Sequence, residues 1–213
     1  MPNPAVFSQV VNTLLTNTFV CSVTYYDEYQ YLKNRNNFEL VERYLGQIQL
    51  RISSTEDQDV FFLAYEDIHP NAKKAAKDVF SDIKQNLRPC IEFIELIMRM
   101  QQCDHLITGS VIEAHKLMSQ IDTNPSFREQ LQTLGRELKL SSDGTDRTRL
   151  DKLLKFMKDR GYIVLSNAER EIYKVTGKIE YLHEVIQFLT EHENIKEENE
   201  EEQENNQQVG LPL

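Results

Sequence analysis

One segment in the last third of the chain constrains the fold most: a helix with one apolar and one basic face, followed directly by a β-hairpin. Within Asp146–Arg160, apolar residues recur every three or four positions, at Leu150, Leu153, Leu154 and Met157. At about 100° per residue, this spacing places them in one stripe along an α-helix. Gly161 comes next, and a glycine after a last turn rich in Lys and Arg is typical of a helix C-terminus. The sequence therefore predicts an amphipathic helix that ends at Gly161.

The outer face of this predicted helix is basic. It carries six Lys and Arg residues against three Asp residues, in a protein whose formal net charge is −10. The six cations are Arg147, Arg149, Lys152, Lys155, Lys158 and Arg160. We predict that they contact nucleic-acid phosphates. The alternative is a basic face that is merely solvated, in a module that contacts only proteins.

Two β-prone runs follow, residues 162–165 and 171–176, with the polar residues 166–170 between them. This pattern predicts a β-hairpin. A basic helix that leads into a two-stranded wing is typical of winged helix-turn-helix modules, which place that helix in a groove of DNA. We therefore predict a winged-helix domain in the C-terminal half of the chain.

The N-terminal third has the same order of predicted elements. They are helices at 4–17, 26–33 and 37–45, a β-prone run at 18–24, and a hairpin with strands near 48–52 and 60–63. The fold class that follows is α-rich α+β, with tandem winged-helix domains and short β-hairpin wings. The counterpart of the basic helix offers only Arg43 against Glu39 and Glu42, so it is unsuited to binding phosphates.

We expect the first domain to bind protein instead. Tyrosines cluster in it, and Tyr is favoured at protein interfaces because it has a large apolar area with a polar tip. These rings could equally cover the core of a small domain. A helix predicted over Cys90–Cys103 is apolar nearly all round, which indicates burial in the second domain's core or in a dimer interface. The predicted partner-interface residues are Tyr25, Tyr26, Tyr29, Tyr44, Ile91, Ile94 and Met98.

The remaining boundaries follow from helix start and stop signals. Arg88-Pro89 is expected to end a connecting helix. Thr108-Gly109-Ser110 is expected to cap a helix at 111–121, and Asn124-Pro125-Ser126 to start another. A final helix is expected at 179–189. The predicted domains are 1–69, an N-terminal winged helix; 70–88, a connecting helix; 89–190, a C-terminal winged helix; and 191–213, an acidic disordered tail.

The tail holds most of the negative charge. Residues 191–213 contain eight Glu and one Lys, so the tail carries −7 and residues 1–190 carry −3. Its polar composition has little to bury, which predicts disorder. Its role is either solubility or mimicry of nucleic acid, in competition for a basic groove.

Known catalytic motifs are missing from the sequence. It has seven glycines, no glycine-rich phosphate loop, no G-x-S-x-G and no H-E-x-x-H, so we predict no enzyme, no catalytic residue and no cofactor. Cys103, His105 and His115 lack the clustered pairs of a zinc site, so we predict no metal. Cys21, Cys90 and Cys103 are expected to be buried thiols. With no apolar run near ~20 residues and no secretion signal, we place the protein in the cytoplasm and expect no membrane contact.

The order of segments resembles the MukE/MksE-type subunits of bacterial condensins, which belong to the kleisin-interacting tandem winged-helix (KITE) family. No single motif is diagnostic, and the resemblance covers nearly the whole folded chain. The segments that carry it are 27–46 leading into the hairpin 47–65, the apolar helix after Pro89, the linker 142–147 entering 150–161, the wing 172–176, and the Glu-rich C-terminus.

This resemblance implies a non-enzymatic, nucleoid-associated subunit. Such a protein forms a homodimer, binds a kleisin and through it an SMC ATPase, and helps hold DNA, for chromosome segregation or for plasmid defence. The family's DNA-facing positions match Arg147, Lys152, Lys155, Lys158 and Arg160 approximately. Because Asp151 and Asp159 lie on the same helix, DNA binding by the isolated protein should be weak. The alternative is a free-standing winged-helix transcription regulator, which would usually carry a net basic DNA-binding domain.

Overall fold

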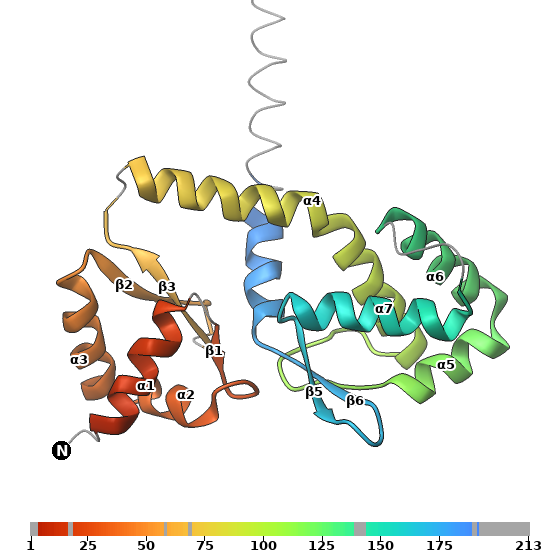
Figure 1. The fold of residues 1–213 in the computed structure, drawn as a ribbon, viewed down its shortest axis with the longest axis horizontal. Coiled ribbons are helices and arrows are strands. Elements are labelled where there is room, and N and C mark those ends of the chain that lie inside the picture. Colours follow the sequence, from red (N-terminus) through yellow and green to blue (C-terminus); the bar gives the residue numbers. More distant parts are fainter. Residues whose placement is uncertain are drawn as a thin grey trace, which may run out of the picture.

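The computed structural model describes residues 4–16, 19–57, 59–67, 70–138, 144–188 and 191. It is rich in helix and contains two three-stranded antiparallel sheets, which confirms the α-rich α+β prediction. Two separate hydrophobic clusters lie in the chain, one built from α1 to β3 and one from α4 to residue 185. We call these parts the N-terminal unit and the C-terminal unit (Figure 1). The predicted tail lies outside the described residues, apart from Glu191.

The N-terminal unit has the element order predicted from the sequence. Its elements are α1 (Pro4–Leu15), β1 (Val20–Cys21), α2 (Tyr26–Lys33), α3 (Arg35–Gly46), β2 (Leu50–Ser54) and β3 (Val60–Tyr65). The strands form a sheet in the order β1-β3-β2. The Asn34 side chain accepts hydrogen bonds from the backbone N–H groups of Asn36 and Asn37, so α3 begins before the predicted residue 37. The apolar faces of α1 and α3 meet in the core, where Leu14 and Leu45 are fully buried.

The C-terminal unit contains a longer set of helices. Its elements are α4 (Pro70–Gln101), β4 (Val111–Glu113), α5 (Ala114–Thr123), α6 (Pro125–Glu137), α7 (Asp146–Asp159), β5 (Ile163–Asn167), β6 (Ile172–Val175) and a last helix that includes residues 178–188. The strands form a sheet in the order β4-β6-β5. Asn124 accepts from the Ser126 N–H at the start of α6, as predicted. Both sheets thus place their first strand beside their third.

The prediction that Pro89 ends a helix is wrong, because α4 continues through it. A proline inside a helix removes one hydrogen bond and clashes with the preceding turn, at a cost of roughly 3 kcal/mol or more. After the proline the helix buries Phe93, Leu96 and Ile97 almost completely in the core. Each such side chain contributes about 1.5–3 kcal/mol, so burial outweighs the cost of the proline. Figure 1 shows that α4 bends along its length and does not end at the proline.

The predicted helix at 111–121 is also partly wrong. Residues 111–113 form strand β4, in which Val111 lies opposite Lys174 and Glu113 opposite Ile172, and the helix starts only at Ala114. Thr108-Gly109-Ser110 is a turn before this strand rather than a helix cap. Gly109 has φ +90° and its N–H donates to the Val175 carbonyl, at 2.9 Å. The pairing with β6, sixty residues away in the chain, overrides the local helical pattern.

The predicted amphipathic helix and its hairpin are confirmed. Leu150, Leu153 and Leu154 are fully buried, and Thr145 caps α7 by accepting from the Thr148 N–H. Gly161 follows the helix with φ +76°, in the left-handed region that favours glycine.

We expect Gly161→Ala to lower the free energy of unfolding by about 1 kcal/mol, because an L side chain is strained at this positive φ. Gly161→Asn should cost less, since Asn tolerates the left-handed conformation better. Urea denaturation of the three proteins measures both effects. Equal midpoints for wild type and the alanine variant would show that the turn relaxes without strain.

The two units touch through residues that are distant in sequence. The ring of Tyr181, in the last helix, lies 5.0 Å from the ring centroids of both Phe19 and Phe62. The Gly177 N–H donates to the Cys21 sulfur at 3.3 Å. The Glu56 N–H donates to Glu184 at 2.8 Å. These contacts join the first sheet to the segment that follows the second wing.

The Tyr181 contact gives the unit interface a pH dependence. Burial, with a smaller contribution from Glu184, raises the pKa of Tyr181 above its usual value of about 10. The unfolded chain therefore ionises first as the pH rises. The contribution of Tyr181 to the free energy of unfolding is therefore fully present below about pH 10. It is lost as the pH rises through the pKa that Tyr181 has in the folded protein.

We therefore expect Tyr181→Phe to lose less stability than wild type when the pH rises from about 9 to about 11. Burial also raises the pKa of Tyr29, Tyr31 and Tyr173, so part of the pH dependence should remain. Urea midpoints at both pH values test this. An identical loss in the two proteins would mean that Tyr181 ionises equally easily in the folded state.

Candidate nucleic-acid and partner interfaces

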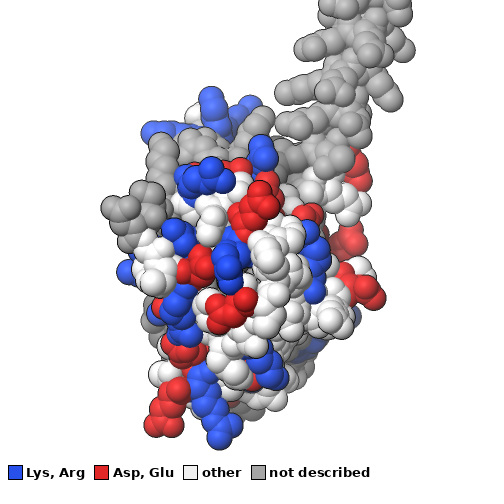
Figure 2. Space-filling view, turned by 90° about the vertical axis from the view of Figure 1, so that its right-hand side faces the viewer, with Lys and Arg blue, Asp and Glu red and all other residues white. Residues whose placement is uncertain are grey.

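The six predicted phosphate-binding cations lie on α7 and at its end, but they differ in accessibility. Lys155 and Lys158 are exposed, whereas Arg147, Arg149, Lys152 and Arg160 are half-buried. On the face drawn in Figure 2, Lys and Arg side chains alternate with Asp and Glu, and the described residues there form no broad patch of one sign. On α7 itself, Arg147 pairs with Asp151 and Arg149 pairs with Asp146, so carboxylates interrupt the basic face of the helix.

Arg147 is held by two carboxylates. Its Nε lies 3.0 Å from Asp151, one turn further along α7, and its guanidinium also pairs with Glu171 in the turn of the second hairpin. The hydrogen bonds to Glu171 and then to Asp151 raise the pKa of Arg147. Arg147 thus ties the wing to the helix, and its guanidinium is already compensated within the chain.

Arg149 and Arg160 also have structural roles. Asp146 lies 2.8 Å from Arg149 and 3.2 Å from Arg128 of α6, so one carboxylate joins α6 to the first turn of α7. The Arg160 guanidinium stacks 3.7 Å from the ring centroid of Phe156. Three of the six predicted cations therefore help to hold the unit together.

The second wing contributes cations that sequence reasoning missed. Arg170 in its turn and Lys174 on β6 are both exposed. Because the hairpin was predicted, the Lys and Arg residues in its sequence could have been added to the candidate phosphate contacts. The exposed cations of α7 and its wing are thus Lys155, Lys158, Arg170 and Lys174.

The predicted partner residues also divide into exposed and buried sets. Tyr26 and Tyr44 are 60% and 45% exposed. Tyr29 is buried and donates from its hydroxyl to Asp59 at 3.2 Å, so it belongs to the core. Burial, and then Asp59, raises the pKa of Tyr29. Among the α4 residues, Ile94 is in the core of the C-terminal unit.

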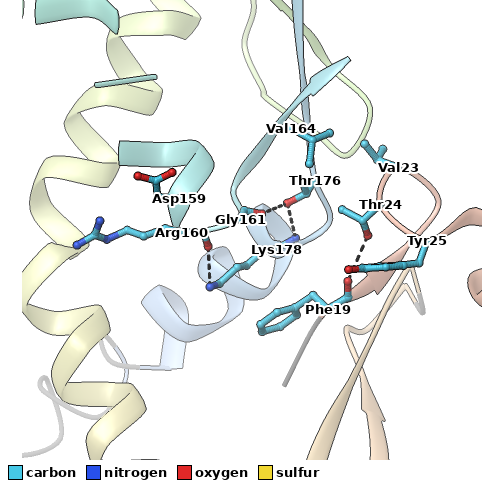
Figure 3. A pocket seen from close by; sticks show the side chains of 10 residues that line it. All are labelled: Phe19, Val23, Thr24, Tyr25, Asp159, Arg160, Gly161, Val164, Thr176 and Lys178. Carbon is cyan, nitrogen blue, oxygen red and sulfur yellow. Dashed lines mark hydrogen bonds between the residues drawn. The ribbon is translucent and has the colours of Figure 1, made fainter. Parts of the chain in front are cut away.

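Tyr25, Ile91 and Met98 are half-buried. Tyr25 lines a cavity of about 490 Å³ between the units, together with Phe19 and Thr24 on one side and the end of α7 on the other. Figure 3 shows that the polar groups here bond to one another: Lys178 Nζ donates to the Arg160 carbonyl at 2.8 Å, and Thr24 Oγ1 donates to the Phe19 carbonyl. Tyr25 and the end of the basic helix were predicted to belong to separate sites. In the structure they line the same cavity between the units.

A family described as condensin complex protein MksE matches residues 5–186. The chain belongs to the MksE family. The matched range includes all the site residues above and nearly all of both units of this MksE-family protein, from the second residue of α1 to residue 186 of the last helix. A search of curated proteins found no match.

Membership of the MksE family makes the chain a subunit of a condensin complex. Among its described residues, no group of three His, Cys, Asp or Glu side chains is placed to hold a metal ion. The three cysteines are free thiols, with Cys21 and Cys90 buried and Cys103 half-buried. None of the described helices is long and apolar enough to cross a bilayer.

Proposed function

We propose that this protein is a non-enzymatic accessory subunit of a bacterial condensin-like SMC complex. In this proposal it forms a homodimer, binds the kleisin and through it the SMC ATPase, and helps to hold DNA on the nucleoid in the cytoplasm. The match to the MksE family over both units is the observation that carries the proposal. Chromosome organisation and plasmid defence would place the same demands on such a subunit.

We assign both units to the winged-helix class within this proposal. Each has a helix, a strand, further helices and a hairpin, and each sheet has the order first strand, third strand, second strand. The C-terminal unit differs by one additional helix between its strand and its basic helix. The predicted boundaries at 69, 88 and 190 remain our proposal for the domains. Residues 70–88 of the continuous α4 are then the connecting helix, and the rest of α4 belongs to the C-terminal domain.

For protein contacts, the exposed tyrosines support the N-terminal unit as a docking surface. Tyr44 packs edge-on against Phe7, with 5.7 Å between ring centroids, while 45% of its surface remains exposed. Tyr65 and Ile48 are also 42% and 49% exposed. Aromatic residues held rigidly at the surface lose little entropy when they bind, so they suit the kleisin or a second copy of the chain.

For DNA, the contact surface in this proposal is α7 with its wing. Four exposed cations are enough for weak contacts with the phosphate backbone of DNA, which carry no sequence information. Asp151 and Glu171 oppose binding by the isolated protein, because they already neutralise Arg147. DNA would be held firmly only where the ATPase and kleisin supply further contacts.

The basic helix with its wing is also what a free-standing transcription regulator would use, and a salt series on the isolated protein separates the two. Each phosphate contact contributes roughly −0.9 to the slope of log K against log salt, so about four contacts predict a slope of about −3.6. We expect micromolar or weaker binding that does not depend on sequence. Nanomolar affinity for a defined palindrome would support the regulator.

A further inference from the structure

A second cavity, of about 390 Å³, lies between the two units and is acidic. The turn of the first hairpin, the loop after α4 and the last helix line it. Its lining includes Glu56, Asp57, Asp59, Glu180 and Glu184, and no Lys or Arg is among its described lining residues. His183 also lines it, with Nδ1 3.9 Å from Glu180 Oε2. We call it the acidic cleft. Both units contribute to it, so it exists only while they are docked.

Neutral donors hold several of these carboxylates in place. Glu180 accepts from the Thr108 N–H at 3.0 Å and from its hydroxyl at 3.2 Å, and Glu184 accepts from the Glu56 N–H at 2.8 Å. Such bonds fix the oxygen atoms but leave the negative charge of each group in place. The side chains therefore form a pre-positioned set of acceptors.

Thr55 gives an independent indication of a ligand. It lines the acidic cleft and is only 3% exposed, yet its hydroxyl has no hydrogen-bond partner. A buried polar atom without a partner is unfavourable, and native proteins keep few of them. A donor that reached this oxygen through the wall of the cleft would satisfy it.

We propose that the acidic cleft binds a lysine or arginine side chain from a basic segment of a partner protein. A cationic head can bond to several carboxylates, while its aliphatic stem packs on Ile107, which is 59% exposed at the rim. The carboxylates are spread along the cleft and, among the described residues, no three converge as a metal ion requires. A long side chain fits this spread better. The identification of this partner as another protein of the complex rests on the proposed function.

The test uses the full chain and a fluorescein-labelled peptide of alternating lysine and alanine, with binding followed by fluorescence anisotropy. The cleft variant carries Glu56→Gln, Asp57→Asn and Glu184→Gln. The control variant carries Glu197→Gln, Glu198→Gln and Glu200→Gln in the tail, which changes the net charge equally. We expect the cleft variant to bind about tenfold more weakly and the control less than about twofold. Equal losses would mean that the peptide responds to net charge alone, which overturns the proposal.

Thr55→Val tests the buried hydroxyl with little change of shape. We expect roughly threefold weaker peptide binding, with the thermal unfolding temperature unchanged or raised. Unchanged affinity would contradict the role of Thr55. Saturable binding of Mg²⁺ or Ca²⁺, abolished in the cleft variant, would identify a cation site and overturn the proposal. A protein that binds the peptide through the cleft but ignores the kleisin would instead disprove the proposed function.

Discussion

Replacing Gly177 with alanine should destabilise the protein by about 2–3 kcal/mol and loosen the contact between its units. A Cβ atom at this position would lie 2.4 Å from Val60 Cγ2 and 2.8 Å from Cys21 Cβ. Both distances are far below van der Waals contact, and Val60 and Cys21 are fully buried in the first sheet. Either the units separate at this point or the sheet shifts.

Gly46→Ala is the matched control. Its added Cβ would meet only Glu66 Oε2, at 3.8 Å, so we expect an unchanged or slightly raised stability. Urea denaturation compares the free energies of unfolding, and limited proteolysis reports whether the units come apart. If both variants unfolded with the wild-type midpoint, the close packing of Gly177 against the first sheet would be refuted.

The triple variant Lys152→Glu, Lys155→Glu and Lys158→Glu should weaken DNA capture by the assembled complex by at least roughly tenfold. It reverses three cations on α7, and Lys155 and Lys158 are fully on the outer face. The apolar stripe of α7 is untouched, so folding and dimerisation should persist. DNA retention by the reconstituted complex at moderate salt measures the effect.

A matched charge change on another helix separates local from general electrostatics. Lys73, Lys74 and Lys77 are exposed on α4, and changing all three to Glu alters the net charge equally. We expect this control to lose much less DNA. Wild-type capture by the α7 variant, or equal losses in both, would refute the assignment of α7 as a DNA contact.

Features set by local periodicity could be predicted from the sequence. The apolar stripe of α7, its end at Gly161 and both hairpins follow from the spacing of neighbouring residues. The continuity of α4 through Pro89 could not be predicted, because it depends on burial against helices that follow later in the chain. Strand β4 was missed for the same reason, since its partner β6 lies sixty residues away.

The candidate interfaces were only partly predictable. The sequence shows how many cations α7 carries, but not that Glu171 and Arg128 reach it from other elements. Periodicity also could not separate Tyr29, which is in the core, from Tyr26 and Tyr44 at the surface. The acidic cleft was not foreseen because its carboxylates come from segments more than a hundred residues apart.

Light scattering of the purified protein, alone and mixed with a candidate kleisin, tests the central claim most directly. The account predicts a mass near twice the 25.0 kDa of one chain, and a single heavier species when the kleisin is added. A protein that keeps its own mass in the presence of the kleisin, yet shifts a promoter fragment, would contradict the account and indicate a transcription regulator.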